Sequence, residues 1–212
     1  MEDAGCLGWR ERKKLATREA LSLAAIRLAL EHGPENVRVP EIAAEAGVSP
    51  RTFNNYFSSV PEAICALAAE RAMTLGELVR RRPRAEQLAE AVTSALVEVH
   101  ASPEYHKEFV RMIITIPLLR AEFFKTIIAR DNALADAIAE RVGSPPGDLF
   151  PQILAAAYGS ATRVATHRWL HDDSVEFLTL LREAVGLIAP MAAARDRTTS
   201  NESNGRAPGH AA

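Results

Sequence analysis

The stretch "IAAEAGVSPRTFNNYF", residues 42–57, contains two short helical patterns separated by a glycine. Gly47 can adopt the left-handed backbone conformation that ends a helix. Ser49 is a favoured N-cap residue, and Pro50 suits the first helical position because the amide there has no partner within the helix. The stretch therefore predicts two short helices joined by a tight turn, which is a helix-turn-helix motif.

The second of these helices is predicted to have one buried face and one polar face. Phe53 and Phe57 lie four residues apart, so they share a face and are expected to anchor the helix. Polar side chains occupy most of the other positions: Arg51, Thr52, Asn54, Asn55 and Tyr56. Such a helix fits the major groove of DNA, where arginine pairs with guanine and asparagine with adenine. A helical hairpin with a merely solvated polar face is the alternative.

A local cluster of basic residues precedes the motif, although the chain as a whole is slightly acidic. The 212 residues include 25 lysines and arginines and 27 aspartates and glutamates, for a formal net charge of −2. This balance excludes a uniformly basic surface, so any contact with phosphates must be local. Such a surface is available near the N-terminus, in the residues Arg10, Arg12, Lys13, Lys14 and Arg18.

Helical patterns cover the chain between two polar ends. Apolar residues recur at helical spacing and no segment reads convincingly as a strand, so the predicted fold class is all-α with about nine helices. The expected helices lie at about 10–32, 39–46, 50–56, 61–81, 84–101, 103–116, 118–142, 148–171 and 174–194. Residues 1–9 are predicted to be a disordered leader and residues 195–212 a disordered tail.

The stretch "TREALSLAAIRLALEHGPENVRVPEIAAEAGVSPRTFNNYFSSVPEAI", residues 17–64, resembles the DNA-binding domain of the TetR family of transcriptional regulators. The segment "IAAEAGVS" and the pair Tyr56-Phe57 are its most specific parts. Further along, "TIPLLRAEFFKTIIARDNALADAIAERVG" resembles the C-terminal domain of the mycofactocin-regulator (MftR) branch. The resemblance implies a three-helix DNA-binding head at residues 10–60, which a long helix joins to a helical ligand-binding and dimerisation domain at residues 61–194.

The resemblance also implies which residues contact DNA. Two positions depart from the family pattern: Val60 stands where a phosphate-binding lysine is common, and Arg38 where a threonine commonly caps the second helix. The phosphate contact is therefore predicted to move partly to Arg38 and the N-terminal basic cluster. The complete predicted DNA-binding set is Lys14, Arg18, Arg38, Ser49, Pro50, Arg51, Thr52, Asn54, Asn55 and Tyr56.

The C-terminal part carries more apolar surface than a single helix stripe needs. This surplus fits either a plain bundle core or an apolar ligand cavity between helices, and the TetR resemblance favours the cavity. The expected ligand is a long hydrophobic molecule such as a fatty acyl chain, with acyl-coenzyme A as one candidate. Its candidate lining residues are Phe109, Met112, Phe124, Tyr158 and Trp169.

Small residues recur in the penultimate predicted helix, in the segment "ILAAAYGSATRVA". They allow close approach of a neighbouring helix, either within the chain or across an interface. In the TetR family the last two helices form a two-fold dimer, so the resemblance implies a homodimer that reads a palindromic operator. The implied function is a repressor released from DNA by a hydrophobic ligand. The alternative is a DNA-binding regulator without such a ligand, controlled by a protein partner or constitutive.

Other function classes find little support in the sequence. It shows no nucleophile elbow, phosphate loop or paired carboxylates, so no enzyme, catalytic residue or cofactor is predicted, and a helical enzyme or carrier is a remote alternative. His167 and His171 are four residues apart, but no third ligand completes a metal site. No apolar run reaches the ~18 residues of a membrane span, and no signal peptide is recognisable, so a cytoplasmic location is expected.

Overall fold

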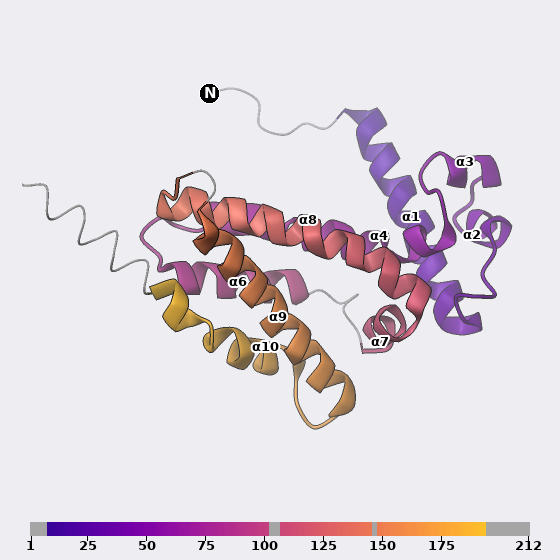
Figure 1. Cartoon of the computed structure of the whole chain (residues 1–212). Helices are drawn as coiled ribbons and strands as arrows, with labels where there is room; N and C mark the ends of the chain where they lie inside the picture. Colours follow the sequence, from indigo (N-terminus) through magenta and orange to yellow (C-terminus); the bar gives the residue numbers. More distant parts are fainter. Residues whose placement is uncertain (1–7, 102–106, 146–147, 194–212) are drawn as a thin grey trace, which may run out of the picture. The chain divides into compact units, whose positions relative to one another are not determined.

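The computed structural model describes residues 8–101, 107–145 and 148–193, which form ten α-helices and no strand (Figure 1). The predicted all-α class is confirmed. The helices are α1 (Trp9–His32), α2 (Val39–Glu45), α3 (Pro50–Asn54), α4 (Val60–Met73), α5 (Leu75–Arg81), α6 (Leu88–His100), α7 (Lys107–Thr115), α8 (Pro117–Val142), α9 (Leu149–His171) and α10 (Phe177–Gly186). The predicted leader and tail lie almost entirely outside the described residues.

Two of the expected helices are interrupted, which corrects the predicted boundaries. The helix expected at about 61–81 breaks at Thr74, between α4 and α5. There the Thr74 hydroxyl and backbone N–H both donate to the carbonyl oxygen of Arg71, at 2.8 and 3.0 Å, which tightens the turn. The last helix likewise ends at Gly186 and is followed by a turn, where one helix was expected to continue to residue 194.

The described residues divide into two compact units. The head unit comprises residues 8–70 and 107–125, and the body unit comprises residues 71–101, 126–145 and 148–193. The head unit thus takes in α7, which contacts α1, and the first part of α8. The domains expected from the sequence, residues 10–60 and 61–194, assign α7 and the first part of α8 to the C-terminal domain instead.

The core of the head unit holds the helix-turn-helix in place. It is built from apolar residues of α1 to α4, α7 and α8, of which the largest fully buried members are Leu21, Ile42, Phe53, Phe57, Ile64 and Leu119. A buried hydrogen bond joins two of the helices, because the hydroxyl of Ser22 on α1 donates to the carbonyl oxygen of Ala63 on α4 at 2.6 Å. α1 and α4 therefore form a fixed base for α2 and α3.

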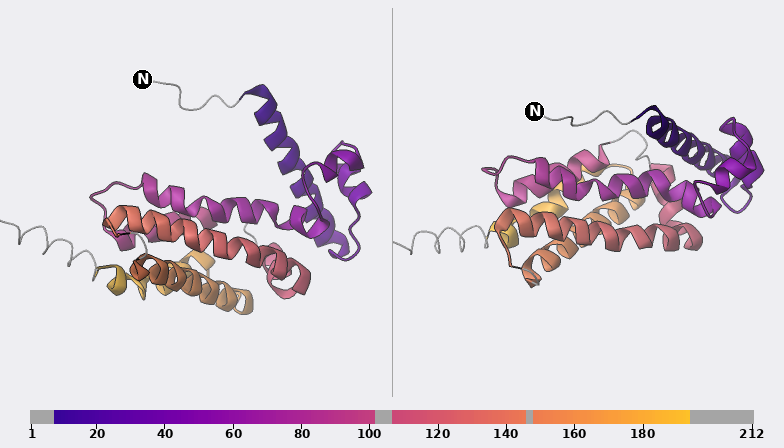
Figure 2. Two further views of the ribbon diagram at one scale, coloured as in Figure 1. Left: turned by 45° about the horizontal axis from the view of Figure 1, so that its top comes forward. Right: turned by 90° about the horizontal axis from the view of Figure 1, so that it is seen from above.

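The core of the body unit is built from α5, α6, α8, α9 and α10. α9 and α10 lie along one another, and α10 also contacts α6 (Figure 2). Its largest fully buried residues are Tyr158, Leu75, Leu88, Leu96, Leu134 and Ile138. The apolar stripes of five helices thus share one core.

A histidine is partly enclosed by this core. The Nδ1 atom of His100, the last residue of α6, lies 2.7 Å from the carbonyl oxygen of Leu96, and its ring centroid is 5.5 Å from that of Phe177. Burial disfavours the charged ring and, together with the positive charges of Arg130 and Arg71, outweighs the backbone hydrogen bond and lowers the pKa of His100 to about 4. His100 is therefore neutral near pH 7.

We expect this histidine to make the fold less stable in mild acid. The unfolded chain, in which the pKa of His100 is about 6.5, takes up the proton first, so the free energy of unfolding falls as the pH drops from about 6.5 to about 4. The loss reaches ~3 kcal/mol at the lower end. Urea unfolding of the parent and of His100→Gln at several pH values measures it, because glutamine can still donate to Leu96. If the free energy of unfolding changed with pH in the same way in both proteins, this expectation would be contradicted.

Candidate nucleic-acid interface

The turn between α2 and α3 forms as the sequence predicts. Gly47 has a φ of +66°, in the left-handed region that favours glycine. The backbone N–H of Val48 donates to the carbonyl oxygen of Ala43 at 2.9 Å, which closes the turn. Ala43 is fully buried, so its small side chain allows the two helices to approach closely. The predicted helix-turn-helix is confirmed.

α3 is only five residues long, so its ends need support from elsewhere. Ser49 is its N-cap, as predicted, and its Oγ accepts from the backbone N–H of Thr52 at 3.1 Å. The hydroxyl groups of Ser49 and Thr52 also lie 2.9 Å apart. Pro50 occupies the first helical position. The N-terminal end of α3 is therefore fixed by local interactions that can be recognised in the sequence.

The two faces of α3 differ in burial as expected. Phe53 and Phe57 are 0% and 2% exposed, and their ring centroids lie 5.6 Å apart. On the other side, Arg51, Asn54 and Asn55 are exposed, while Thr52 and Tyr56 are half-buried. The aromatic pair thus holds the helix to the core and leaves a polar surface in solvent.

The start of α1 adds exposed positive charge to the head unit. Arg10, Arg12, Lys13 and Lys14 are all exposed within the first two turns of the helix. The ammonium group of Lys13 lies 5.1 Å from the ring centroid of Trp9, at the beginning of the helix. These side chains can supply the local basic surface that the acidic total charge requires.

Arg18 differs from the rest of the basic cluster because it is held within the head unit. Its Nε lies 2.5 Å from Oε1 of Glu70 on α4, and one terminal N–H group donates to the carbonyl oxygen of Tyr56 at 3.0 Å. Its guanidinium carbon lies 4.4 Å from the ring centroid of Phe57. Only 29% of the side chain is exposed. The sequence predicts that Arg18 contacts DNA, whereas in the structure its guanidinium faces protein groups.

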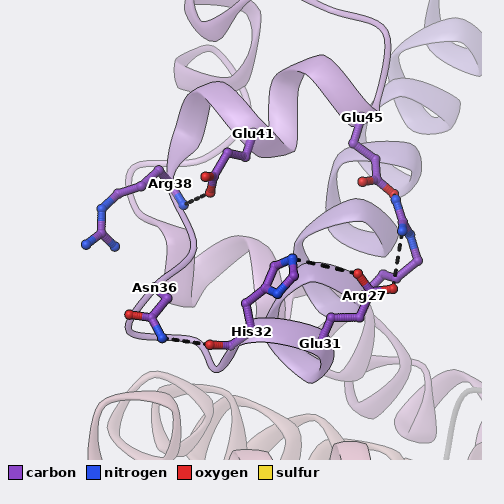
Figure 3. Close-up of polar contacts among 7 residues, drawn as sticks. All are labelled: Arg27, Glu31, His32, Asn36, Arg38, Glu41 and Glu45. Carbon is purple, nitrogen blue, oxygen red and sulfur yellow. Dashed lines mark hydrogen bonds and ion pairs between the residues drawn. The ribbon is translucent and has the colours of Figure 1, made fainter.

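Arg38 caps α2 and remains exposed (Figure 3). Its backbone N–H donates to the Glu41 carboxylate at 2.9 Å, which is the half of a capping box that an arginine can form. The guanidinium points away from Glu41 and donates to the backbone carbonyl oxygens of Glu35, at 2.6 Å, and of Val37, at 3.2 Å. Arg38 is thus a cap through its backbone and an exposed positive charge through its side chain.

An ion pair between α1 and α2 was missed by the sequence analysis. Arg27 on α1 pairs with Glu45 on α2 and, at 3.3 Å, with Glu31 one turn further along α1 (Figure 3). Glu31 follows Arg27 at helical spacing and was a recognisable partner. Glu45 is separated from Arg27 by a loop and most of α2, so no local pattern indicates that contact.

Val60, which stands where a lysine is common, begins α4. Val60 is half-buried and packs against the head core, and Ser59 caps the helix by accepting from the backbone N–H of Glu62 at 3.2 Å. The Glu62 carboxylate accepts from the backbone N–H and the hydroxyl of Ser58, at 2.8 and 2.6 Å. Ser59 and Glu62 have the spacing of a capping box, a signal that the sequence analysis overlooked.

The charge state of Glu62 follows from these contacts. Burial raises the pKa of its carboxyl group, but the hydrogen bonds from Ser58 and the positive charges of Arg18 and Lys125 outweigh burial and lower the pKa overall. Glu62 is therefore ionised near neutral pH. The first turn of α4 thus carries an apolar side chain and a negative charge, which makes it a poor phosphate contact.

The five predicted ligand-lining residues are divided between the two units. Phe109 and Met112 belong to the core of the head unit, and Phe124 is 58% exposed. Tyr158 and Trp169 belong to the body unit, where Tyr158 is fully buried. Trp169 is half-buried, with its ring centroid 5.1 Å from that of Phe177.

The structure also shows the surroundings of the histidine pair His167 and His171 and of Cys65. His167 and His171 stack with ring centroids 4.4 Å apart, and no group of three or more metal-ligating side chains is found among residues 8–101, 107–145 and 148–193. Cys65 is buried, and desolvation together with the charge of Glu122 raises the pKa of its thiol to about 12. None of the described helices is both long enough and apolar enough to cross a bilayer.

Both the N-terminal and the C-terminal part of the chain match models of known protein families. Residues 23–59 match the model for bacterial regulatory proteins of the tetR family, and residues 82–193 match the model for the MftR C-terminal domain. The first range contains the helix-turn-helix. The second covers more than half of the 212 residues.

Two curated relatives agree with these matches. The transcriptional regulator TcmR of Streptomyces glaucescens is 29% identical over 191 residues, which cover 84% of each chain. A protein of Mycobacterium tuberculosis described as a candidate mycofactocin biosynthesis regulator, MftR, is 28% identical over 179 residues, 82% of this chain and 88% of the relative.

The fold is shared with the repressor FadR of Thermus thermophilus, whose structure was solved in complex with lauroyl-CoA. The TM-score is 0.52 at 22% identity, over 81% of this chain and 92% of FadR. The helix-turn-helix, the all-helical architecture and the two family matches lead to one conclusion. The chain belongs to the TetR family of DNA-binding transcriptional regulators and carries a C-terminal domain of the MftR type.

Proposed function

We propose that α3 lies in the major groove of a palindromic operator and that its exposed side chains read the bases. The observation that carries this proposal is the division of α3 into a buried aromatic face and a solvent-facing polar face. Arg51, Asn54 and Asn55 are the proposed base readers. Ser49, Pro50, Thr52 and Tyr56 lie at the ends and flanks of α3, where they would contact the backbone of the DNA. Residues 10–60 are the proposed DNA-binding domain.

The phosphate contacts are proposed to come from exposed basic side chains outside α3. These are Arg38 on one side of the motif and the start of α1 on the other, with the residues Arg10, Arg12, Lys13 and Lys14. The first turn of α4 is left out of this set because it carries Val60 and an ionised Glu62. Arg18 is left out because its guanidinium faces Glu70 and Tyr56.

We expect Arg38→Ala to weaken binding to specific and non-specific DNA by about the same factor. A phosphate contact carries no sequence information, and its loss lowers the slope of log Kd against log salt by ~1. Fluorescence anisotropy with operator and scrambled duplexes at several salt concentrations measures both quantities. Unchanged affinity and slope would show that Arg38 serves only as the cap of α2.

We propose that the chain acts as a homodimer through one face of α9 together with α10. This α9 face is apolar and exposed: Ile153 and Val164 are 54% and 59% exposed, and the small residues Ala156 and Ser160 lie between them. Ala155, in contrast, is fully buried within the body unit. The small-residue segment thus has one face for the body core and another that is free to pack on a second copy.

Light scattering coupled to gel filtration tests the dimer. The parent chain is expected to elute at about twice its 23.1 kDa mass, and Ile153→Arg with Val164→Arg is expected to elute as a monomer. Leu118→Arg is the matched control, because Leu118 is 66% exposed but lies in the head unit. A parent monomer, or a dimer that survives both arginines, would contradict the proposed face.

We propose that a hydrophobic small molecule, with long-chain acyl-coenzyme A as the first candidate, binds in the body unit and releases the operator. The lauroyl-CoA complex of FadR supports the ligand class, and Tyr158 and Trp169 are the candidate lining residues that lie in the body core. Release requires that the ligand bind the DNA-free conformation more tightly than the DNA-bound one. Residues 61–194 are the proposed effector and dimerisation domain.

The two tryptophans allow a direct test of this ligand class. Trp9→Phe removes the exposed tryptophan and leaves Trp169 as the single reporter. Lauroyl-CoA is expected to change the Trp169 fluorescence and, over the same concentration range, to dissociate the operator, whereas free coenzyme A does neither. Tight operator binding at saturating lauroyl-CoA and at saturating hydrophobic drugs would favour the alternative, a regulator without a small-molecule ligand.

A further inference from the structure

Arg18 joins three parts of the head unit that are far apart in the sequence. From α1 it reaches Glu70 on α4, the carbonyl oxygen of Tyr56 just beyond α3, and the ring of Phe57. A single guanidinium makes all three contacts: its Nε to Glu70, one terminal N–H group to Tyr56, and its central carbon over the Phe57 ring. Lysine has no planar group and could satisfy at most part of this set.

The contact with Tyr56 lies just beyond the C-terminal end of α3. The N-terminal end of α3 is fixed by Ser49. At the other end, the carbonyl oxygens of Thr52 and Phe53 accept from backbone N–H groups of the turn that follows, and Arg18 donates to the carbonyl oxygen of Tyr56 in this turn. A positive charge beside these carbonyls is favourable because it complements the partial negative charge at a helix end. Arg18 therefore joins the turn after α3 to α1, a contact that the local backbone hydrogen bonds do not make.

The charge of Arg18 is largely compensated by protein groups. Glu70 is its direct partner, and its charge also acts on the carboxylate of Glu62. With two acidic neighbours and a half-buried guanidinium, Arg18 adds little to the positive potential that attracts phosphates. Its geometry serves the orientation of α3 better than it serves DNA contact.

We propose that Arg18 is a positioning residue. Together with Glu70 it fixes the C-terminal end of the recognition helix against α1 and α4, and it acts on operator reading through Tyr56 and Phe57 without touching DNA. The inference rests on the proposed function insofar as α3 must read the operator. It replaces the expectation that Arg18 is itself a DNA contact.

Three variants of the full chain distinguish this role from the others: Arg18→Lys, Arg18→Gln and Glu70→Gln. We expect Arg18→Lys to lower operator affinity by about 10-fold, because it keeps the charge but loses most of the charge-assisted hydrogen bonds. We expect Glu70→Gln to lower the operator affinity as well. Removal of a negative charge from the head unit would, by simple electrostatics, raise the affinity for DNA instead. Arg120→Lys, at an exposed arginine of α8 within the head unit, is the control and should change nothing.

The decisive readouts are non-specific affinity and salt dependence, measured at a temperature where melting curves show every variant fully folded. A positioning residue leaves both at their parent values, even in Arg18→Gln. A salt slope lowered by ~1 in Arg18→Gln, with equal losses on scrambled DNA, would overturn the inference in favour of a phosphate contact. Parent-like operator affinity of Arg18→Lys, or losses explained by unfolding alone, would also overturn it. Failure of the parent chain to select any operator would instead refute the proposed function.

Discussion

Phe53→Ala is expected to unfold the DNA-binding part of the head unit, whereas Asn54→Ala, at the next position, should leave its stability unchanged. Phe53 is fully buried and contacts Phe57, so its truncation leaves a cavity in the core that holds α3. Such truncations cost about 3–5 kcal/mol, which is a large share of the stability of a small domain. We expect a lower Tm and loss of binding to every DNA sequence.

Asn54→Ala is the matched comparison because Asn54 is exposed on the same short helix. Its stability should stay within about 0.5 kcal/mol of the parent, while its operator affinity falls by about 10- to 100-fold through loss of a base contact. Circular dichroism melting curves and anisotropy titrations of both variants measure these effects. Equal loss of stability in the two variants would contradict the assignment of opposite faces.

Gly76→Ala is expected to destabilise the body unit even though alanine is the better helix former. A Cβ at Gly76 in α5 would lie 2.7 Å from the carbonyl oxygen of Ala133 in α8, and backbone cannot move aside as a side chain can. We expect the free energy of unfolding to fall by about 2 kcal/mol and Tm by roughly 4–8 °C, because overpacking outweighs the gain in helix propensity.

Gly186→Ala provides the control for this expectation. Gly186 is the last residue of α10, and nothing lies within 4 Å of where its Cβ would be. The same substitution there should leave Tm unchanged or raise it slightly, because no neighbour is displaced. Thermal melts at one protein concentration compare the two variants. A Gly76→Ala protein as stable as Gly186→Ala would show that α5 and α8 do not approach as closely as described.

Local signals explain why the helix-turn-helix could be predicted from the sequence. Gly47 requires a turn, Ser49 and Pro50 mark the start of a helix, and Phe53 with Phe57 defines its buried face. Each of these signals depends on residues a few positions apart. The structure agrees with all of them, including the helix cap in which the Ser49 side chain accepts from the backbone N–H of Thr52.

Contacts between distant residues explain what the sequence did not reveal. Arg18 lies 52 residues from Glu70 and 38 from Tyr56, so on the sequence it was one more basic residue in a cluster. Phe109 and Met112 have the apolar character of ligand-lining residues, but whether such residues face a cavity or the head core depends on how α7 packs. The break at Thr74 depends on a hydroxyl group that bonds back to Arg71, and helical periodicity does not register it.

Selection of bound sequences from random DNA tests the central claim, that the exposed face of α3 reads a palindromic operator. The parent chain is expected to enrich a palindrome whose half-sites lie about one helical turn apart or slightly more, ~10 base pairs centre to centre. The Asn54→Ala, Asn55→Ala double variant, folded as well as the parent, is expected to lose or change its preference at positions within each half-site. Enrichment of no palindrome, or the same preference in the parent and the double variant, would show that this face of α3 does not read the operator.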